Sequence, residues 1–349
     1  MKIPVALRDT PYEVTLGAGV RHEVSSFIVE HLTRARVVAV ITSPAIRRQP
    51  WFDFNFALEA HIIEVADGEA AKTLTSLGRV CEELARLGVS RHDVIVGVGG
   101  GAITDLAGFA AAVYLRGITV LHVPTSVVGQ VDAAIGGKTA VDIAAGKNLV
   151  GAFHQPAGVW CDEETLSTLS DRERIAGMGE VAKCWLLEGR PSTLLARATM
   201  SEFVEVSVAL KARIVAADEF EQTGQRALLN YGHTLGHAIE LVSLARDPDE
   251  LRHGEAVAIG LAFAARLARR MGRVREDVVV ETDAVLDFFE LPTRLTGTFD
   301  TSVLLEVMSR DKKAHHDLTF VLAGQHGCEV VSGINSVVVR EVLEQFQEA

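Results

Sequence analysis

The chain has 349 residues, a length that suggests about two domains, and 48% hydrophobic with 23% charged residues is the balance of a soluble globular protein. The formal net charge of −12 argues against nucleic acid as the main partner, because binding to a phosphate backbone requires a basic surface. An acidic total does not exclude an anionic small molecule, since one basic pocket can lie within an acidic protein.

Cysteine usage and hydropathy favour a cytoplasmic protein. The four cysteines are scattered singly, so neither a disulfide framework nor a zinc ribbon is indicated. The N-terminal "MKIPVALRDTPYEV" alternates apolar and polar residues like a strand and lacks the apolar core of a signal peptide. No stretch approaches the roughly 18 uncharged apolar residues of a membrane span, so we expect no membrane partner.

Strand-like and helical stretches alternate up to about residue 165. The runs 37–42, 93–101 and 118–126 are typical of buried strands, whereas 69–88 has helical periodicity and ends on Gly88. Such alternation predicts a parallel sheet covered by helices. We therefore expect residues 1–165 to form a Rossmann-like α/β domain that binds a nucleotide.

Beyond residue 165 the β-branched runs become rare. The stretches 202–222, 233–245 and 255–272 all have the pattern of helices. We expect residues 166–349 to form a second, all-α domain.

A glycine cluster ends the strand-like run in "VIVGVGGGAITDLAGFAAA" (94–112). Glycines between a strand and a helix let a phosphate approach backbone N–H groups at the positive end of the helix. The spacing is not GxGxxG with an acid about twenty residues on, so the standard dinucleotide fingerprint is not met. A tight turn without a ligand is the alternative.

The segment "DAAIGGKTA" (132–140) ends like a P-loop, but Asp132 stands where that motif begins with glycine, so we reject a P-loop. Lys138 and Lys147 remain, two lysines near the expected sheet edge. They would suit an anionic substrate or the phosphates of a cofactor; solvated loop lysines are the alternative.

Two histidines lie four residues apart in "RALLNYGHTLGHAIE" (226–240). His233 and His237 would share one helix face, the spacing of a zinc-binding helix, yet Thr234 replaces the glutamate of the protease motif. From these residues alone, a metal, a proton, a phosphate and a satisfied core histidine all remain open.

Seven ordered blocks together resemble dehydroquinate synthase and its relatives, the sugar phosphate cyclases, over nearly the whole chain. The blocks are "GVGGGAITDLAGFAAAVYLRG", "VPTSVVGQVDAAIGGKTAVD", "GKNLVGAFHQP", "GMGEVAK", "NYGHTLGHAIE", "RHGEAVAIG" and "SRDKK". The resemblance implies an N-terminal domain that binds NAD, a helical C-terminal domain that binds a divalent metal, and a homodimer. Zinc is the expected ion, with cobalt as an alternative.

The resemblance also implies roles for single residues. The metal ligands would be Glu180, His233 and His253, a set that leaves coordination positions open, as in catalytic zinc sites. His237 would then serve proton transfer or contact the substrate phosphate. The implied catalytic and substrate-binding residues are Asp132, Lys138, Asn148, Lys183, Lys211, Arg226, Asn230, His237 and Lys312, with Arg116 contributed across the dimer interface. The implied cofactor-binding residues are Glu69, Lys72, Gly99, Gly100, Gly101, Asp105, Thr125, Ser126, Lys138, Lys147 and Asp162.

The implied reaction converts 3-deoxy-arabino-heptulosonate 7-phosphate, a phosphorylated seven-carbon sugar acid, into 3-dehydroquinate of the shikimate pathway. Phosphate is eliminated and NAD is regenerated in each turnover, so the net reaction is that of a lyase. The dense set of cations suits a substrate with both a phosphate and a carboxylate, because such groups bind through charge-assisted hydrogen bonds.

Several positions depart from the family pattern. The usual "GGKTGVN" is here "GGKTAVD" with Ala140 and Asp142, and the block commonly written AEVIK is "GEVAK" (179–183). Ser43 and Pro44 stand where an acid for the adenosine ribose is expected. These departures favour a specialised relative, such as an aminodehydroquinate synthase of an antibiotic pathway.

Two further alternatives are open. A cyclase of sedoheptulose 7-phosphate is disfavoured, because Arg226, Asn230 and Lys312 suit a carboxylate that this sugar lacks. A metal-dependent polyol dehydrogenase has a similar fold and is the alternative from a different class.

Overall fold

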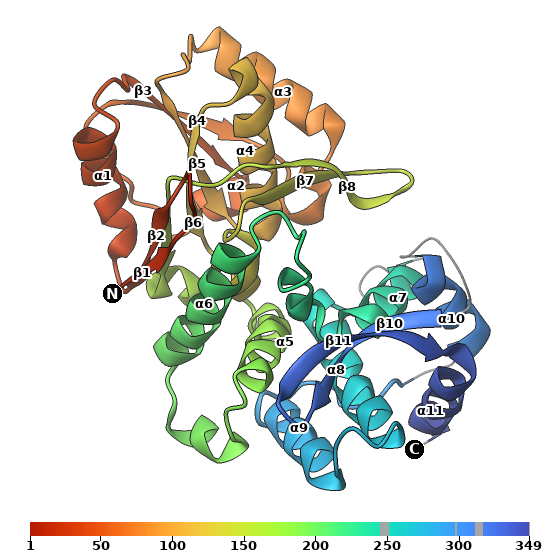
Figure 1. Cartoon of the computed structure of the whole chain (residues 1–349). Coiled ribbons are helices and arrows are strands. Elements are labelled where there is room, and N and C mark those ends of the chain that lie inside the picture. Colours follow the sequence, from red (N-terminus) through yellow and green to blue (C-terminus); the bar gives the residue numbers. More distant parts are fainter. Residues whose placement is uncertain (245–250, 297–298, 311–316, 349) are drawn as a thin grey trace. The chain divides into compact units, whose positions relative to one another are not determined.

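The computed structural model describes residues 1–244, 251–296, 299–310 and 317–348 (Figure 1). The chain divides into two compact units. The first comprises Met1–Ser170 with Met200–Phe220, and the second comprises Asp171–Thr199 with Glu221–Ala349. The helix α6 (Met200–Ala217) therefore belongs to the first unit although it follows residue 165, because it packs on β1 and on the turn Gly129–Ala133.

A seven-stranded sheet forms the centre of the first unit. Its strands are β1 (Lys2–Val5), β2 (Tyr12–Gly17), β3 (Val37–Thr42), β4 (Glu59–Glu64), β5 (Val94–Gly99), β6 (Thr119–Pro124) and β9 (Gly158–Asp162). They lie in the order β1-β2-β9-β6-β5-β3-β4, and every neighbouring pair is parallel except β1 and β2. The prediction of a parallel α/β sheet is confirmed.

The strand order positions the glycine cluster. The run β4-β3-β5-β6-β9 is the 2-1-3-4-5 order of flavodoxin-like sheets rather than the dinucleotide-binding order, and the order reverses between β3 and β5. Ligands of open α/β sheets bind at the carboxyl ends of the strands beside such a reversal. Gly99, Gly100 and Gly101 lie at the carboxyl end of β5, where α4 (Gly101–Val113) begins.

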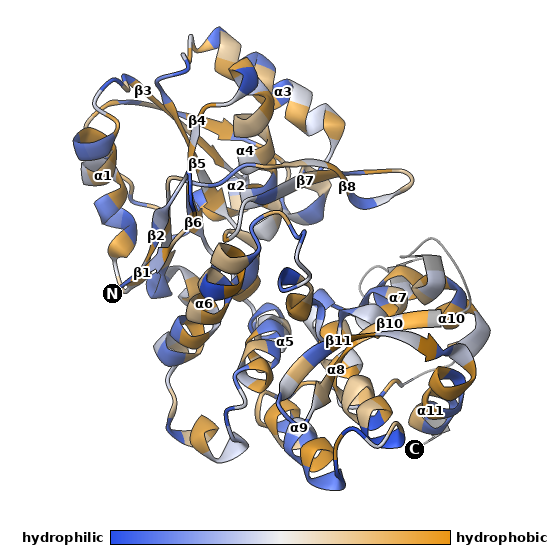
Figure 2. Ribbon diagram, in the orientation of Figure 1, coloured by the Kyte–Doolittle hydropathy of each residue, from blue (hydrophilic) through white to orange (hydrophobic). Residues whose placement is uncertain are grey.

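Alternating side chains of the strands bury the two faces of this sheet. Val37, Ala39 and Ile41 of β3 pack with α3 (Leu74–Arg86) and α4, whereas Val38 and Val40 pack with α1 (Glu23–His31). Figure 2 shows β3, at the centre of this packing, coloured as hydrophobic. The predicted helix 69–88 begins later than expected because Thr73 caps α3, its hydroxyl accepting a hydrogen bond from the Ser76 N–H.

Short elements complete the first unit. They are the helix α2 (Pro44–Arg47), the hairpin of β7 (Lys138–Ile143) and β8 (Gly146–Phe153), the π-helix Gly129–Ala133, and the 3₁₀ turns Val20–His22, Gly68–Ala71, Tyr114–Arg116 and Glu163–Thr168. Lys147 and Asn148 thus lie on a strand of the hairpin. Thr73 pairs with Asp142, which connects the hairpin to the start of α3.

Asp93 connects the starts of β3 and β5. Its buried carboxylate accepts hydrogen bonds from the backbone N–H groups of Arg36 (2.7 Å), Val37 (2.9 Å) and Ser90 (2.6 Å). Burial by itself raises the pKa of Asp93, but these N–H donors lower it below its ordinary value. Such a carboxylate stabilises the fold above its unfolded-state pKa, and the contribution is lost as the pH falls through the folded pKa.

We therefore expect Asp93→Asn to lower the free energy of unfolding at neutral pH by about 1–3 kcal/mol, because an amide replaces a carboxylate with three N–H donors. The melting temperatures of the two proteins should converge as the pH falls toward about 3. Thermal unfolding across this range measures the difference. A gap that stayed constant on acidification would show that the charge of Asp93 is not what stabilises the fold.

The second unit is mainly helical. Its helices are α5 (Asp171–Leu187), α7 (His233–Leu244), α8 (His253–Arg270), α9 (Glu276–Phe288), α10 (Thr301–Arg310) and α11 (Ser336–Glu348), with 3₁₀ turns at Ser192–Arg197 and Arg226–Asn230. α8 is buried along nearly its whole length and packs on α5, α7, α9 and α11. Among the described residues, no helix is long and apolar enough to cross a membrane.

A two-stranded antiparallel sheet corrects the prediction that this half is all-α. It consists of β10 (Asp317–Gly324) and β11 (Gly327–Asn335). One side of this hairpin packs on α8, with Phe320 against Phe263 at 5.9 Å between ring centroids. β11 is largely exposed, so its sequence lacks the continuous β-branched run that marks a buried strand.

Candidate active site

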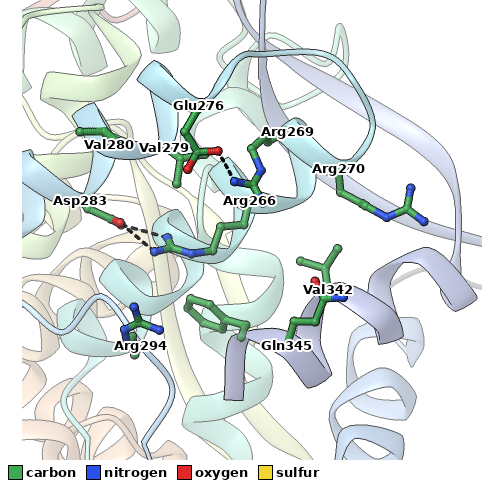
Figure 3. Close-up of a pocket in the computed structure, with 11 residues that line it drawn as sticks. Arg266, Arg269, Arg270, Glu276, Val279, Val280, Asp283, Arg294, Val342 and Gln345 are labelled. Carbon is green, nitrogen blue, oxygen red and sulfur yellow. Dashed lines mark hydrogen bonds and ion pairs between the residues drawn. The ribbon is translucent and has the colours of Figure 1, made fainter. Parts of the chain in front are cut away.

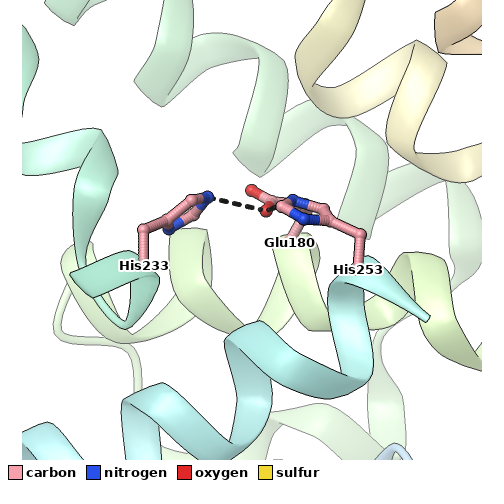
Figure 4. A group of neighbouring side chains, drawn as sticks. All are labelled: Glu180, His233 and His253. Carbon is pink, nitrogen blue, oxygen red and sulfur yellow. Dashed lines mark hydrogen bonds and ion pairs between the residues drawn. The ribbon is translucent and has the colours of Figure 1, made fainter. Parts of the chain in front are cut away.

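Three helices of the second unit bring Glu180, His233 and His253 together (Figure 4). Glu180 lies on α5, and the two histidines are the first residues of α7 and α8. Glu180 Oε1 lies 3.3 Å from His233 Nε2 and 3.2 Å from His253 Nε2. One ligand atom from each residue lies within 4.8 Å of the others, so the three can share one ion.

Glycines beside the histidines allow the helix backbones to touch. A Cβ on Gly254 would lie 1.6 Å from the Ala176 carbonyl oxygen of α5, and a Cβ on Gly260 would lie 1.8 Å from the Gly232 carbonyl oxygen. Gly232, directly before His233, has a φ of +79°, which favours glycine. The close approach of α5 and α7 to α8 therefore depends on positions where any side chain would separate the helices.

The other nitrogen of each histidine also has a partner. His253 Nδ1 lies 3.1 Å from Glu240 Oε2, and His233 Nδ1 lies 3.0 Å from the Tyr231 carbonyl oxygen. With an ion bound, a proton on Nδ1 would satisfy either acceptor and leave the Nε2 lone pair free for the ion. Metal-binding histidines are oriented in this way by carboxylates and carbonyls behind them.

The electrostatics of this cluster suit a cation. Burial by itself raises the pKa of Glu180, but Lys183 and His233 lower it by a larger amount. The pKa of Glu180 is therefore well below its ordinary value, and the carboxylate is ionised. Burial lowers the pKa of His253, but Glu180 and Glu240 more than offset this and raise it to about 10. Glu180 and Glu240 therefore stabilise a positive charge on the His253 imidazole. A divalent ion would take the place of the proton that gives His253 this charge.

Glu240 was not among the residues singled out from the sequence. Its signal was present, because Glu240 follows His233 by seven positions and His237 by three and so shares their helix face. We expect Glu240→Gln to weaken binding of Zn²⁺ by about 10- to 100-fold without unfolding the protein. Chelator competition measures the affinity. An unchanged zinc affinity would show that Glu240 does not orient His253.

The structure places the remaining predicted residues of the second unit as follows. The His237 ring lies 5.1 Å from that of His233 and 6.1 Å from that of His253, between centroids, but His237 is outside the three-residue cluster. Burial and then the neighbouring histidines lower the pKa of His237 to about 4, so its imidazole is neutral.

The other predicted residues of this unit are cations and an amide. Lys183 is buried and forms an ion pair with Glu180. Arg226 is buried, Asn230 is exposed, and Lys312 lies outside the described residues.

In the first unit, packing accounts for part of the glycine cluster. A Cβ on Gly99 would lie 2.6 Å from Ile103, and one on Gly97 would lie 2.8 Å from Ala107. Glycine is therefore required at both positions because β5 packs closely against α4. Gly100 differs, because its nearest neighbour would be the Ser126 hydroxyl at 3.2 Å. No side chain caps α4, whose first N–H groups suit a phosphate.

Four of the predicted cofactor and substrate residues meet around Lys72. Its buried ammonium lies 2.8 Å from Asp105 Oδ2, 3.7 Å from Glu69 Oε1 and 2.5 Å from Asn148 Oδ1. Burial raises the pKa of Asp105 to about 6, although Lys72 lowers it in part. The sequence assigned Asn148 to substrate and the others to cofactor, whereas the structure joins all four.

Other predicted residues of this unit have defined partners. Lys211, on α6, forms an ion pair with Asp132, and its ammonium lies 2.6 Å from the Asp132 carbonyl oxygen. The Thr125 N–H donates to the Gly99 carbonyl, and the Ser126 hydroxyl accepts from the Gly129 N–H. The Thr125 hydrogen bond holds the start of the segment after β6 against the glycine cluster.

Asp162 and Arg116 lie in different settings. The Asp162 carboxylate is buried and accepts hydrogen bonds from the N–H groups of Gly19 (3.0 Å) and Glu164 (3.0 Å), and from the Arg21 guanidinium (2.8 Å). In this structure Asp162 is thus part of the framework, together with Arg21, which the sequence did not single out. Arg116 is exposed and has a φ of 65°, while Lys138 and Lys147 are exposed on the β7–β8 hairpin.

Comparison with known proteins accounts for both units. The family described as "3-dehydroquinate synthase N-terminal" matches residues 62–176, and "3-dehydroquinate synthase C-terminal" matches residues 177–314. The chain belongs to the dehydroquinate synthase family. It is therefore an enzyme of the phosphate-eliminating cyclase class. The glycine cluster lies within the N-terminal match, and Glu180, His233 and His253 all lie within the C-terminal match.

Individual proteins of known name also align with most of the chain. A protein of Amycolatopsis mediterranei, provisionally named an aminodehydroquinate synthase, is 46% identical over 99% of this chain and 94% of its own. The 3-dehydroquinate synthase of Corynebacterium pseudotuberculosis is 40% identical over 87% of this chain and 86% of its own. A 2-deoxy-scyllo-inosose synthase, solved with carbaglucose-6-phosphate, NAD⁺ and Co²⁺, superposes with a TM-score of 0.85 at 25% identity, covering 99% and 100% of the chains.

Proposed function

We propose that the chain is a 3-dehydroquinate synthase-type cyclase that uses NAD and a divalent metal to convert 3-deoxy-arabino-heptulosonate 7-phosphate into 3-dehydroquinate. The observation that carries the proposal is the cluster of Glu180, His233 and His253, whose ligand atoms lie within 4.8 Å of one another. A carboxylate and two imidazoles fit a catalytic zinc-type site, because three protein ligands leave room for substrate oxygens. The structural relative solved with NAD⁺ and Co²⁺ supports the same pair of cofactors.

When bound, NAD would supply reversible oxidation of a substrate hydroxyl, and the metal would supply Lewis-acid polarisation of the oxygen on that carbon. The residues for NAD would be the N–H groups at the start of α4 with Gly100 and Gly101, and the group around Lys72. Glu180, His233 and His253 would hold the metal, with Glu240 orienting His253.

The chain's own groups would bind and orient the substrate. Lys183 and Arg226 are buried cations of the second unit, and Lys211 is a nearly buried cation of the first. Lys183 pairs with Glu180 and Lys211 with Asp132 in this structure, and a substrate phosphate or carboxylate would share or replace these carboxylates through charge-assisted hydrogen bonds. The neutral His237 imidazole can accept a proton or donate one at a fixed position beside the cluster. Lys138, Asn148, Asn230, Lys312 and a partner-subunit role for Arg116 stay predictions, as do the homodimer and the cytoplasmic location.

A second candidate has the amino analogue of this substrate, as in an aminodehydroquinate synthase. The 46% identity over 99% of the chain favours it, since the 3-dehydroquinate synthase reported above is 40% identical over 87%. The departures at Ala140 and Asp142 point the same way.

Phosphate release from three substrates tests the proposal. The metal- and NAD-loaded protein is incubated with 3-deoxy-arabino-heptulosonate 7-phosphate, its amino analogue and sedoheptulose 7-phosphate. We expect release from one or both of the carboxylated substrates and none from the third. Preference for the amino analogue would select the second candidate. Release from sedoheptulose 7-phosphate alone, or net accumulation of NADH with polyols, would reject both.

A further inference from the structure

A pocket of the second unit is lined by four arginines (Figure 3). We name it the arginine pocket: it lies between the last turns of α8, with Arg266, Arg269 and Arg270, and the helices α9 and α11, and Arg294 completes its wall. Its volume is about 270 Å³. Because a helix rises about 1.5 Å per residue, Arg266 lies about 20 Å along α8 from His253, so the pocket is not part of the metal centre.

Three of the arginines are already paired. The Arg266 guanidinium donates to Asp283 Oδ1 (2.9 Å) and Oδ2 (2.7 Å) and to the Ala262 carbonyl oxygen (3.0 Å). Arg269 forms an ion pair with Glu276, and Arg270 forms one with Glu341 at 2.8 Å. Arg266 also lies over the Phe346 ring, 5.3 Å from its centroid. These contacts fix the pocket and neutralise three of its four positive charges.

Arg294 supplies the charge that is left. It is exposed, lines the pocket, and forms no ion pair or hydrogen bond with any residue that the structure describes. The lining thus carries one uncompensated positive charge, in a chain whose net charge is −12. A single guanidinium with two parallel N–H donors matches one carboxylate.

Besides Gln345 and the two carboxylates that pair with Arg266 and Arg269, the rest of the wall is apolar. Val342 and Phe346 are buried beneath the pocket, Val279 is 4% exposed and Val280 is 60% exposed. The exposed Val280, in the same lining as the unpaired Arg294, offers an apolar ring a surface to cover. We propose that the arginine pocket binds a small aromatic or alicyclic monocarboxylate, with its carboxylate on Arg294 and its ring against the valines. Inorganic phosphate would leave those walls uncovered and would bring more negative charge than Arg294 offsets.

Titration of a fluorobenzoate followed by ¹⁹F NMR tests this proposal. We expect saturable binding, displaced by benzoate but not by benzyl alcohol or inorganic phosphate at equal concentration. Arg294→Gln should weaken binding about tenfold or more, the worth of a charge-assisted hydrogen bond. Val280→Glu should abolish binding, because it places a carboxylate at the mouth of the pocket. Arg197→Gln, at another exposed arginine of this unit, is the matched control and should change nothing.

Several results would overturn the proposal. Absence of saturable fluorobenzoate binding would show that the arginine pocket is not a binding site for such carboxylates. Equal displacement by phosphate would reduce it to an anion site, and equal displacement by benzyl alcohol to an apolar one. Unchanged affinity in Arg294→Gln would place the ligand elsewhere, including at the substrate-binding cations. None of these outcomes bears on phosphate release, so failure here is distinguishable from failure of the proposed function.

Discussion

Glu180→Gln is expected to remove the divalent ion and the activity while leaving the protein folded. The substitution keeps the size of the side chain but removes the charge that both His233 and His253 face at about 3 Å. Changes to groups behind metal ligands commonly cost 10- to 100-fold in affinity, so loss of a ligand should cost more than about a hundredfold. Metal content after dialysis and the rate of phosphate release measure the two effects.

His237→Asn is the matched control, because His237 is the adjacent imidazole that lies outside the cluster. It should retain a full equivalent of metal while losing phosphate release. If Glu180→Gln retained stoichiometric metal and full activity, the assignment of the three ligands would be wrong. If His237→Asn lost the metal instead, His237 would be a fourth ligand beside Glu180, His233 and His253.

Gly254→Ala is expected to separate α8 from α5 and to disrupt the same cluster from a distance. A single added methyl group would lie 1.6 Å from the Ala176 carbonyl oxygen, far inside contact distance, so the backbone must move. His253 precedes Gly254 and Glu180 lies one turn beyond Ala176, so that movement separates two of the three ligands. We expect weaker metal binding and a loss of about 1–3 kcal/mol of stability, the usual cost of overpacking.

Gly78→Ala provides the matched control, because Gly78 lies within α3 and a Cβ there would meet nothing within 4 Å. Alanine in such a helix should be neutral or stabilising by up to about 1 kcal/mol. Melting temperature and zinc affinity are measured for both variants. Wild-type zinc affinity in Gly254→Ala would show that the backbone contact does not hold the ligands in place.

Hydrophobic periodicity in the sequence was sufficient to locate the strands that are buried on both faces. β3 occupies the predicted 37–42, and the runs at 93–101 and 118–126 contain β5 and β6, because strands buried on both faces read as continuous apolar runs. The hairpin β10–β11 was missed, since an exposed strand has no such run. The 2-1-3-4-5 strand order could not be predicted, because it depends on contacts between strands far apart in the chain.

In the candidate site, only residues that belong to recognisable sequence motifs could be predicted. The pairing of Glu180 with His233 and His253 came from the family resemblance, and the structure brings these side chains together. Glu240 and Arg21 escaped notice, because a partner behind a ligand and a framework cation have no motif of their own. The role of the glycines beside the histidines could not be predicted either. The sequence does not show which backbone atoms pack against a glycine.

The return of α6 to the first unit means that the chain passes from one unit to the other after Ser170, after Thr199 and after Phe220. A fragment that stops at residue 170 would keep all seven strands but lose the helix that covers β1 and the turn Gly129–Ala133. Such a truncated polypeptide should aggregate unless a peptide spanning 200–220 is added in trans. Recombination by swapping contiguous halves between relatives would for the same reason cut through a folding unit.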